Sequence, residues 1–145
     1  MSTEENKALF HRFMNEVANK GNLSLIDELT SPDFVEHEEL PPGTPPGREA
    51  VKYFFAAWRQ GFPDGQVTLE KVIAEGDLVS CYQTWRGTHT GEFFGIPASG
   101  KPVMFKGNDI IRVANGKIVE HWAVTDNLSL MQQIGAIPEP DEAGI

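Results

Sequence analysis

The stretch that most constrains the fold is 101–126, where two runs rich in β-branched and aromatic residues flank Asn115 and Gly116. An Asn-Gly pair between such runs is a strong signal for a β-hairpin. We expect a three-residue loop, Ala114 to Gly116, with Gly116 in the left-handed conformation that a bulged turn requires. The sequence therefore predicts a long antiparallel hairpin near the C-terminus.

In this register Asp109 lies directly opposite His121, with the Cβ atoms about 5 Å apart. Because side chains alternate, the face with this pair carries Phe105, Gly107, Asp109, Ile111, Val119, His121, Ala123 and Thr125. The other face carries Asn108, Ile110, Arg112, Ile118, Glu120, Trp122, Val124 and Asp126. A carboxylate beside an imidazole raises its basicity and fixes its tautomer, so the pair is a candidate acid–base dyad. The alternatives are a structural hydrogen-bonded pair, or a register in which the two side chains never meet.

Charge and composition exclude several classes of partner. The chain has 145 residues with 12 Lys and Arg against 21 Asp and Glu, a net charge of −9, and no basic run. This excludes nucleic acid and anionic membranes as partners. A single cysteine and the lack of a long apolar run favour a cytoplasmic protein. We expect one domain over 1–145, with a core at about 3–135 and an acidic tail at 136–145.

Helical patterns fill the first part of the chain and strand patterns the second. Ser2 and Glu5 form a capping-box pattern ahead of an amphipathic helix that ends before Gly21. A short helix follows at 23–29, and the clearest amphipathic helix covers 48–60. Strands are expected at 66–74 and 78–88, before the hairpin, and a last short helix at 128–134.

This order of elements predicts an α+β fold, with the helices packed on one face of a curved sheet. A curved sheet over a helix layer leaves room for a pocket between the two. The aromatic residues placed to line it are Phe54, Phe55, Trp58, Trp85, Phe93 and Phe94.

Three further polar residues are candidates for the pocket. His37, among Glu36, Glu38 and Glu39, is either a second titratable group at the pocket mouth or part of a solvated acidic segment. His89 ends a strand before a glycine-rich loop, and lies either at the pocket rim or in a surface turn. Asp126 is either a second pocket carboxylate or the N-cap of the last helix, and the cap is favoured.

Several short motifs in combination resemble one known family. They are Phe62-Pro63-Asp64, Glu75-Gly76-Asp77 with Val79, the run from Gly87 to Pro97, Gly116-Lys117-Ile118-Val119-Glu120-His121-Trp122, and Gln133-Ile134-Gly135. Together they resemble the SnoaL-like "ester cyclase" branch of the polyketide cyclase family, in the nuclear transport factor 2-like superfamily. The resemblance runs from about residue 3 to residue 135.

The resemblance implies a cone-shaped α+β barrel, with N-terminal helices on a highly curved antiparallel or mixed sheet around a deep apolar pocket. It also implies a homodimer or higher homo-oligomer through the outer sheet face. The family's cyclases close a ring by an intramolecular aldol condensation without a cofactor. Their catalytic aspartate falls on Ala123 here, their helper histidine on Asp109 and a pocket asparagine near Phe54. The cyclase's own catalytic set is therefore missing, which argues against polyketide cyclisation.

Three functions stay open at this point. The first is a cofactor-independent enzyme, of cyclase, lyase, isomerase or hydratase type, acting by acid–base chemistry on a small hydrophobic metabolite. Its candidate catalytic residues are His121 as general base, Asp109, His37 and His89, and its candidate substrate-binding residues are Phe54, Phe55, Trp58, Trp85, Phe94, Phe105 and Ala123. The second is a binding protein for a small hydrophobic ligand. The third is an oligomerisation module.

Overall fold

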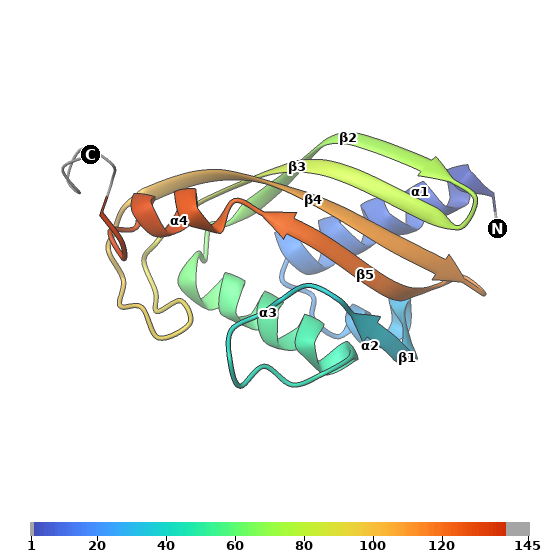
Figure 1. Ribbon diagram of the computed structural model, residues 1–145, viewed down its shortest axis with the longest axis horizontal. Helices are drawn as coiled ribbons and strands as arrows, with labels where there is room; N and C mark the ends of the chain where they lie inside the picture. The colour runs from blue at the N-terminus through green and yellow to red at the C-terminus, as the bar shows by residue number, and fades with distance from the viewer. Residues whose placement is uncertain (1, 139–145) are drawn as a thin grey trace.

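A computed structural model describes residues 2–138 of the chain. The helices are α1 (Thr3–Phe13), the π-helix η1 (Met14–Asn19), α2 (Leu25–Leu29), α3 (Arg48–Gly61) and α4 (Asn127–Gln133). The strands are β1 (Thr30–Glu36), β2 (Gln66–Glu75), β3 (Leu78–Thr88), β4 (Pro102–Ala114) and β5 (Lys117–Thr125). The five strands form one sheet in the order β1-β5-β4-β3-β2, which arches over α1 and α3 (Figure 1). The predicted α+β fold is confirmed, while most of the expected acidic tail lies outside the described residues.

The N-terminal helix begins as its sequence predicts. The Ser2 hydroxyl accepts a hydrogen bond from the Glu5 backbone N–H, and the Glu5 side chain accepts one from the Ser2 backbone, completing the capping box. The helix continues as η1 to Asn19, whose side chain accepts from the Val67 N–H at 2.6 Å and donates to the Val67 carbonyl at 3.1 Å. These two bonds fix the end of the helical segment against the first residues of β2. Within the described residues, no helix is both long and apolar enough to span a membrane.

Helix α3 lies under the sheet and contributes the largest apolar side chains of the core. Phe55 and Trp58 are buried on its inner face. Its first residue, Arg48, donates to the Thr30 carbonyl at 2.6 Å and to the Thr30 hydroxyl at 3.0 Å. Since Thr30 is the first residue of β1, this side chain ties the start of the helix to the edge strand.

Strand β1 is the element that sequence reasoning missed. No strand was expected around Glu36 and His37, but Thr30–Glu36 forms an edge strand parallel to β5. Pro32 and the exposed Asp33 mask its strand pattern, and edge strands tolerate both. The sheet is therefore mixed, and Glu36 pairs in register with His121.

The predicted hairpin exists, but the predicted register is wrong. Asn115 and Gly116 both have positive φ, at 53° and 72°, and form a two-residue turn in which Ala114 pairs with Lys117. The irregularity lies further along, where Val119 is an extra residue between two paired positions.

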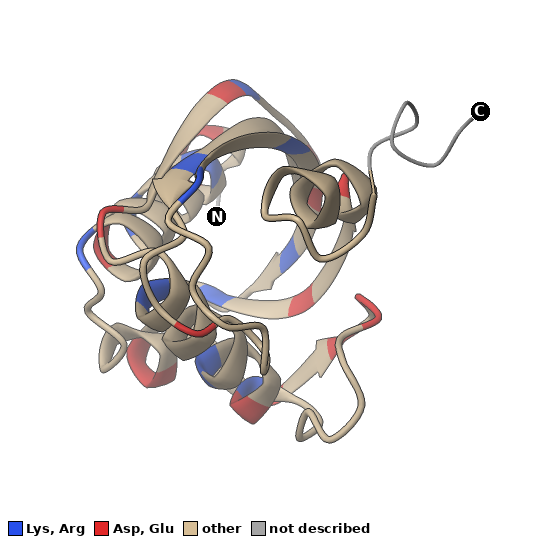
Figure 2. Ribbon diagram, turned by 90° about the vertical axis from the view of Figure 1, so that its left-hand side faces the viewer, with Lys and Arg blue, Asp and Glu red and all other residues tan. Residues whose placement is uncertain are grey.

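This bulge changes which residues face each other. His121 pairs with Ile111, and Asp109 pairs with Ala123. Ile118, expected on the outer face, is buried and faces inward because the extra residue reverses the alternation before it. Asp109 and His121 still share the inner face, as diagonal neighbours. Viewed along the long axis in Figure 2, the sheet curls over the helices, so this inner face is concave.

Candidate functional site

A cavity of about 370 Å³ lies between the concave face of the sheet and the helices. Six of the predicted apolar site residues line it: Phe54, Phe55, Trp58, Trp85, Phe94 and Phe105. The rings contact one another edge to face or stacked, with Trp58 and Trp85 centroids 4.9 Å apart. Ala123, which was expected to line the pocket, is not among the lining residues. The cavity is thus a rigid aromatic chamber of the size that small ligands occupy.

At one wall of this chamber, the His121 imidazole lies between two carboxylates. Its Nδ1 is 2.6 Å from Glu36 Oε2, and its Nε2 is 3.1 Å from Asp109 Oδ1. The three side chains are only 18%, 7% and 10% exposed, in the order His121, Glu36 and Asp109. We call Glu36, His121 and Asp109 the ion triad. The contact between Asp109 and His121 occurs despite the wrong register, because a diagonal pair on one face is within reach of long side chains.

The triad determines the protonation state of the imidazole. Burial lowers the pKa of His121, but hydrogen bonds and charge from Asp109 and Glu36 outweigh burial and raise this pKa well above its ordinary value. Both ring nitrogens then hold protons and donate, one to each carboxylate. At neutral pH the group is therefore an imidazolium fixed between two anions.

Asp109 is held from a second side as well. The Gln83 side-chain amide donates to Asp109 Oδ2 at 2.6 Å, and both residues are buried. With Oδ1 accepting from His121, both oxygens of this carboxylate have a donor. The bond from β3 and the bond from β5 fix the orientation of the Asp109 side chain on β4.

Glu38 is a cavity residue that sequence reasoning did not select. It lines the chamber, and the Thr125 hydroxyl donates to its Oε2 over a long 3.4 Å. Burial is the main cause that raises the pKa of Glu38 to about 7; the negative charges of Asp109 and Glu36 raise it further, against the lowering effect of His121. Glu38 therefore changes charge near neutral pH.

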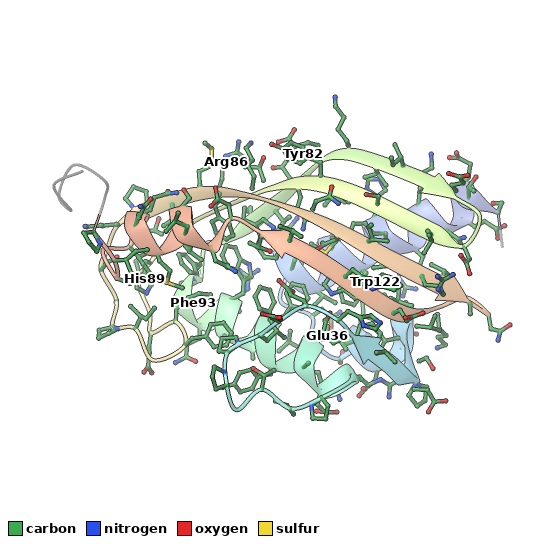
Figure 3. All side chains as sticks on the ribbon, in the orientation of Figure 1. Glu36, Tyr82, Arg86, His89, Phe93 and Trp122 are labelled. Carbon is green, nitrogen blue, oxygen red and sulfur yellow. The ribbon has the colours of Figure 1, made fainter. Side chains whose placement is uncertain are left out.

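Period-two alternation along β1 is the signal that could have found both glutamates. Glu36 and Glu38 point inward from the end of the strand, whereas His37, between them, points out. Glu36 lies beneath β5 in Figure 3, facing the space between the sheet and the helices. His37 was the candidate chosen from the sequence, but its neighbours Glu36 and Glu38 are the residues that line the cavity.

The other two candidate histidines do not line the chamber. His37 Nε2 is 2.8 Å from Glu120 Oε2, and its ring stacks on Trp122 with centroids 4.9 Å apart. His89 is fully buried against Phe62, with Nδ1 2.9 Å from the Ser99 hydroxyl, and burial lowers its pKa. Figure 3 shows His89 near the end of the molecule away from Glu36. Neither histidine therefore lies at the pocket: His37 is exposed, as its second alternative expected, whereas His89 is buried and not in a surface turn.

Asp126 is the N-cap of the last helix, as the sequence favoured. Its side chain accepts from the Ser129 backbone N–H at 3.1 Å and caps α4. It is not among the residues that line the cavity.

Metal binding was considered because donor atoms of Glu36, Glu38 and His121 lie within 4.8 Å of one another. A histidine ligates a metal through a ring nitrogen that carries no proton. In the triad both nitrogens already donate to carboxylates. The arrangement is therefore a hydrogen-bonded ion network, and we do not assign these residues as metal ligands.

Helices under a highly curved mixed sheet, with an aromatic chamber on the concave side, define a cone of the nuclear transport factor 2-like class. The chain belongs to the SnoaL-like polyketide cyclase family, which it matches over residues 8–134. It is 28% identical to the nogalonic acid methyl ester cyclase of Streptomyces nogalater over 128 residues, 87% of this chain and 94% of that protein. It is 30% identical to the aklanonic acid methyl ester cyclase DauD of Streptomyces sp. strain C5 over 140 residues, 92% of this chain and 83% of DauD. The solved structure of TsrD from Streptomyces laurentii superposes with a TM-score of 0.83 at 26% identity, covering 94% of this chain and 99% of TsrD.

Proposed function

We propose that this protein is a cofactor-independent acid–base enzyme acting on a small hydrophobic metabolite beside a carbonyl group. The observation that carries the proposal is the ion triad in the wall of an otherwise aromatic chamber. Buried ionised groups are costly for a fold and cluster at functional sites. A purely packed pocket would gain nothing from an imidazolium and two carboxylates on its surface.

In this proposal a carboxylate and the His121 imidazolium have different roles in the reaction. A carboxylate takes the proton from a carbon next to the carbonyl, and the electron pair moves to the carbonyl oxygen. The imidazolium of His121 offsets part of the negative charge of Asp109 and Glu36, which lowers the electrostatic cost of forming an enolate beside them. His121, which the sequence named as a candidate general base, takes the role of the cation in this proposal, because Asp109 and Glu36 raise its pKa well above the ordinary value.

Ring closure is the first reaction to test, because two relatives are named as methyl ester cyclases. The enolate carbon would attack a second carbonyl of the same molecule, forming a C–C bond, and the resulting alkoxide would take up a proton. All atoms are retained, so no oxidant or reductant is needed. The position that the resemblance gives to the family's catalytic aspartate is Ala123 here, so another carboxylate must take the proton.

The test uses two ligands. Nogalonic acid methyl ester is followed by mass spectrometry and chromatography for the cyclised isomer, and 2-tetralone in D₂O is followed by NMR for deuterium at the carbons beside the carbonyl. We expect exchange above the buffer rate, and a loss of about 10²–10³-fold in His121→Gln, where the positive charge is removed. Binding of both ligands with no exchange and no cyclisation would contradict an enzyme and favour the ligand-binding protein. The open chamber itself argues against a module that serves only for oligomerisation.

We also propose that the protein forms a homodimer through the outer face of the sheet. Tyr82, Met104 and Val124 lie on that face of β3, β4 and β5, and all three are exposed, Val124 to 79%. Figure 3 shows Tyr82 on the side of the sheet away from Glu36. Exposed apolar side chains on one sheet face support an interface there, although Asn108 lies between Tyr82 and Val124. Light scattering should give a dimer for the native chain and a monomer for Val124→Lys; a monomeric native chain would refute the proposal.

A further inference from the structure

The site contains three inward carboxylates, and their hydrogen bonds distinguish them. Asp109 accepts through both oxygens, from His121 and from Gln83. Glu36 accepts from His121 at 2.6 Å and from the Glu38 backbone N–H at 3.2 Å. Lone pairs that already accept hydrogen bonds from the protein are not available to a ligand. Asp109 and Glu36 are therefore assigned as partners of the imidazolium.

Glu38 differs from both. Among the residues that the structure describes, its carboxylate has one hydrogen bond, the long 3.4 Å contact from Thr125. Its side chain lines the chamber, and its carboxylate lies within 4.8 Å of donor atoms of Glu36 and His121. Glu38 is thus the inward carboxylate whose lone pairs stay available to a ligand.

The charged surroundings of Glu38 come from three strands. Glu36 on β1 and Asp109 on β4 contribute negative charge, and His121 on β5 contributes positive charge. The cavity-lining residues of α1, η1 and α3 are uncharged, and α4 contributes Asn127 besides apolar side chains. Glu39, which follows in the chain, also lines the cavity but is exposed. Two anions against one cation, in a partly buried setting, favour a carboxylate that gains and loses a proton easily.

We propose that Glu38 is the catalytic residue that exchanges the proton with the ligand, while the ion triad positions and charges the site around it. This rests on the proposed acid–base function. In the step, the C–H bond beside the carbonyl breaks, an O–H bond forms on Glu38, and the electron pair moves onto the carbonyl oxygen. The same carboxyl group then returns a proton to the product. A base that titrates near neutral pH, as Glu38 does, is the most effective for such a transfer.

The experiment compares Glu38→Gln with Glu75→Gln, which makes the same chemical change at an exposed position on β2 outside the cavity. Carbon-13 NMR of glutamate-labelled protein first identifies the titration of Glu38 without any ligand. The wild type should show a side-chain carboxyl that titrates at about pH 7, absent in Glu38→Gln and retained in Glu75→Gln.

The second readout is deuterium exchange into 2-tetralone as a function of pH. The wild-type rate should rise as Glu38 ionises and then level off. Glu38→Gln should lose about 10²–10⁴-fold and the inflection with it, while Glu75→Gln keeps both the rate and the inflection. Circular dichroism confirms that the variants are folded.

The outcomes separate the two proposals. If the wild type exchanges no hydrogen, the proposed function fails and the role of Glu38 fails with it. If the wild type is active and His121→Gln is not, but Glu38→Gln keeps the wild-type rate and pH profile, the role of Glu38 is overturned and the acid–base function stands. Loss of activity in Glu38→Gln with normal activity in Glu75→Gln supports both proposals.

Discussion

Replacing His121 with leucine tests the ion triad most directly. The change removes the cation between Glu36 and Asp109 but keeps an apolar side chain of similar bulk. Breaking a buried ion pair by removing one partner costs about 3–5 kcal/mol, because it leaves a charge without compensation. Here two carboxylates lose their shared partner, although each keeps a neutral donor, Gln83 for Asp109 and the Glu38 N–H for Glu36. We therefore expect His121→Leu to lower the free energy of unfolding by about 3–5 kcal/mol at neutral pH.

The loss should depend on pH with a defined sign. In the wild type the raised pKa of His121 contributes stability that is complete below about pH 6.5 and is lost as the pH rises through the folded-state value. The difference between the two proteins should therefore be complete below about pH 6.5 and shrink as the pH rises through the folded-state pKa of His121.

Urea unfolding followed by tryptophan fluorescence measures both effects. His37→Leu is the matched control: His37 pairs with Glu120 on a more exposed surface, so its loss should stay below about 1 kcal/mol. Adding Glu36→Gln and Asp109→Asn to His121→Leu should recover most of the lost stability. A His121→Leu protein as stable as the wild type at neutral pH, or equally destabilised at every pH, would refute the triad as described.

Three further predictions follow from the same structure. Glu38→Gln should raise the free energy of unfolding by up to about 3 kcal/mol at about pH 8 and little at about pH 4.5. The reason is that the pKa of Glu38 is raised to about 7, so its ionisation destabilises the fold above the unfolded-state pKa. Urea midpoints at the two pH values measure this effect. Gly91→Ala should lower the melting temperature, since its Cβ would lie 2.0 Å from the Gln60 carbonyl oxygen. The methyl ester of a hydrophobic carboxylic acid should bind at least about tenfold more tightly than the free acid in fluorescence titrations, because four carboxylates and no Lys or Arg line the cavity. Equal affinities of the ester and the acid would contradict this.

The hairpin illustrates how much of the site the sequence could supply. The Asn-Gly turn and the contact between Asp109 and His121 were predicted, but the residues opposite each other were not. Turn residues determine where a hairpin reverses, whereas the position of a bulge depends on how each strand packs on the core. The extra residue Val119 keeps Ile118 on the buried face and His121 on the same side as Asp109. The predicted contact therefore arises from a different geometry, a diagonal rather than a direct pair.

Strand β1 shows why the other half of the site was missed. A parallel edge strand has no local turn that signals its partner, since β1 and β5 are far apart in sequence. Without that pairing, nothing in the sequence brings Glu36 to His121. Alternation alone would have placed Glu36 and Glu38 on the face opposite His37, but it could not have said which face looks into the chamber.

The strand order then explains why the site has this composition. His121 lies on β5, with β4 on one side and β1 on the other, and each neighbour supplies one carboxylate, Asp109 and Glu36. An imidazolium in an aromatic chamber would be costly with no counter-ion, and with only one it would keep an unpaired N–H. Two carboxylates satisfy both ring donors but leave a net negative charge, and this charge acts on the next inward group, Glu38. The fixed network and the titrating glutamate are therefore consequences of one arrangement, so removing either carboxylate of the triad should shift the pH at which Glu38 ionises.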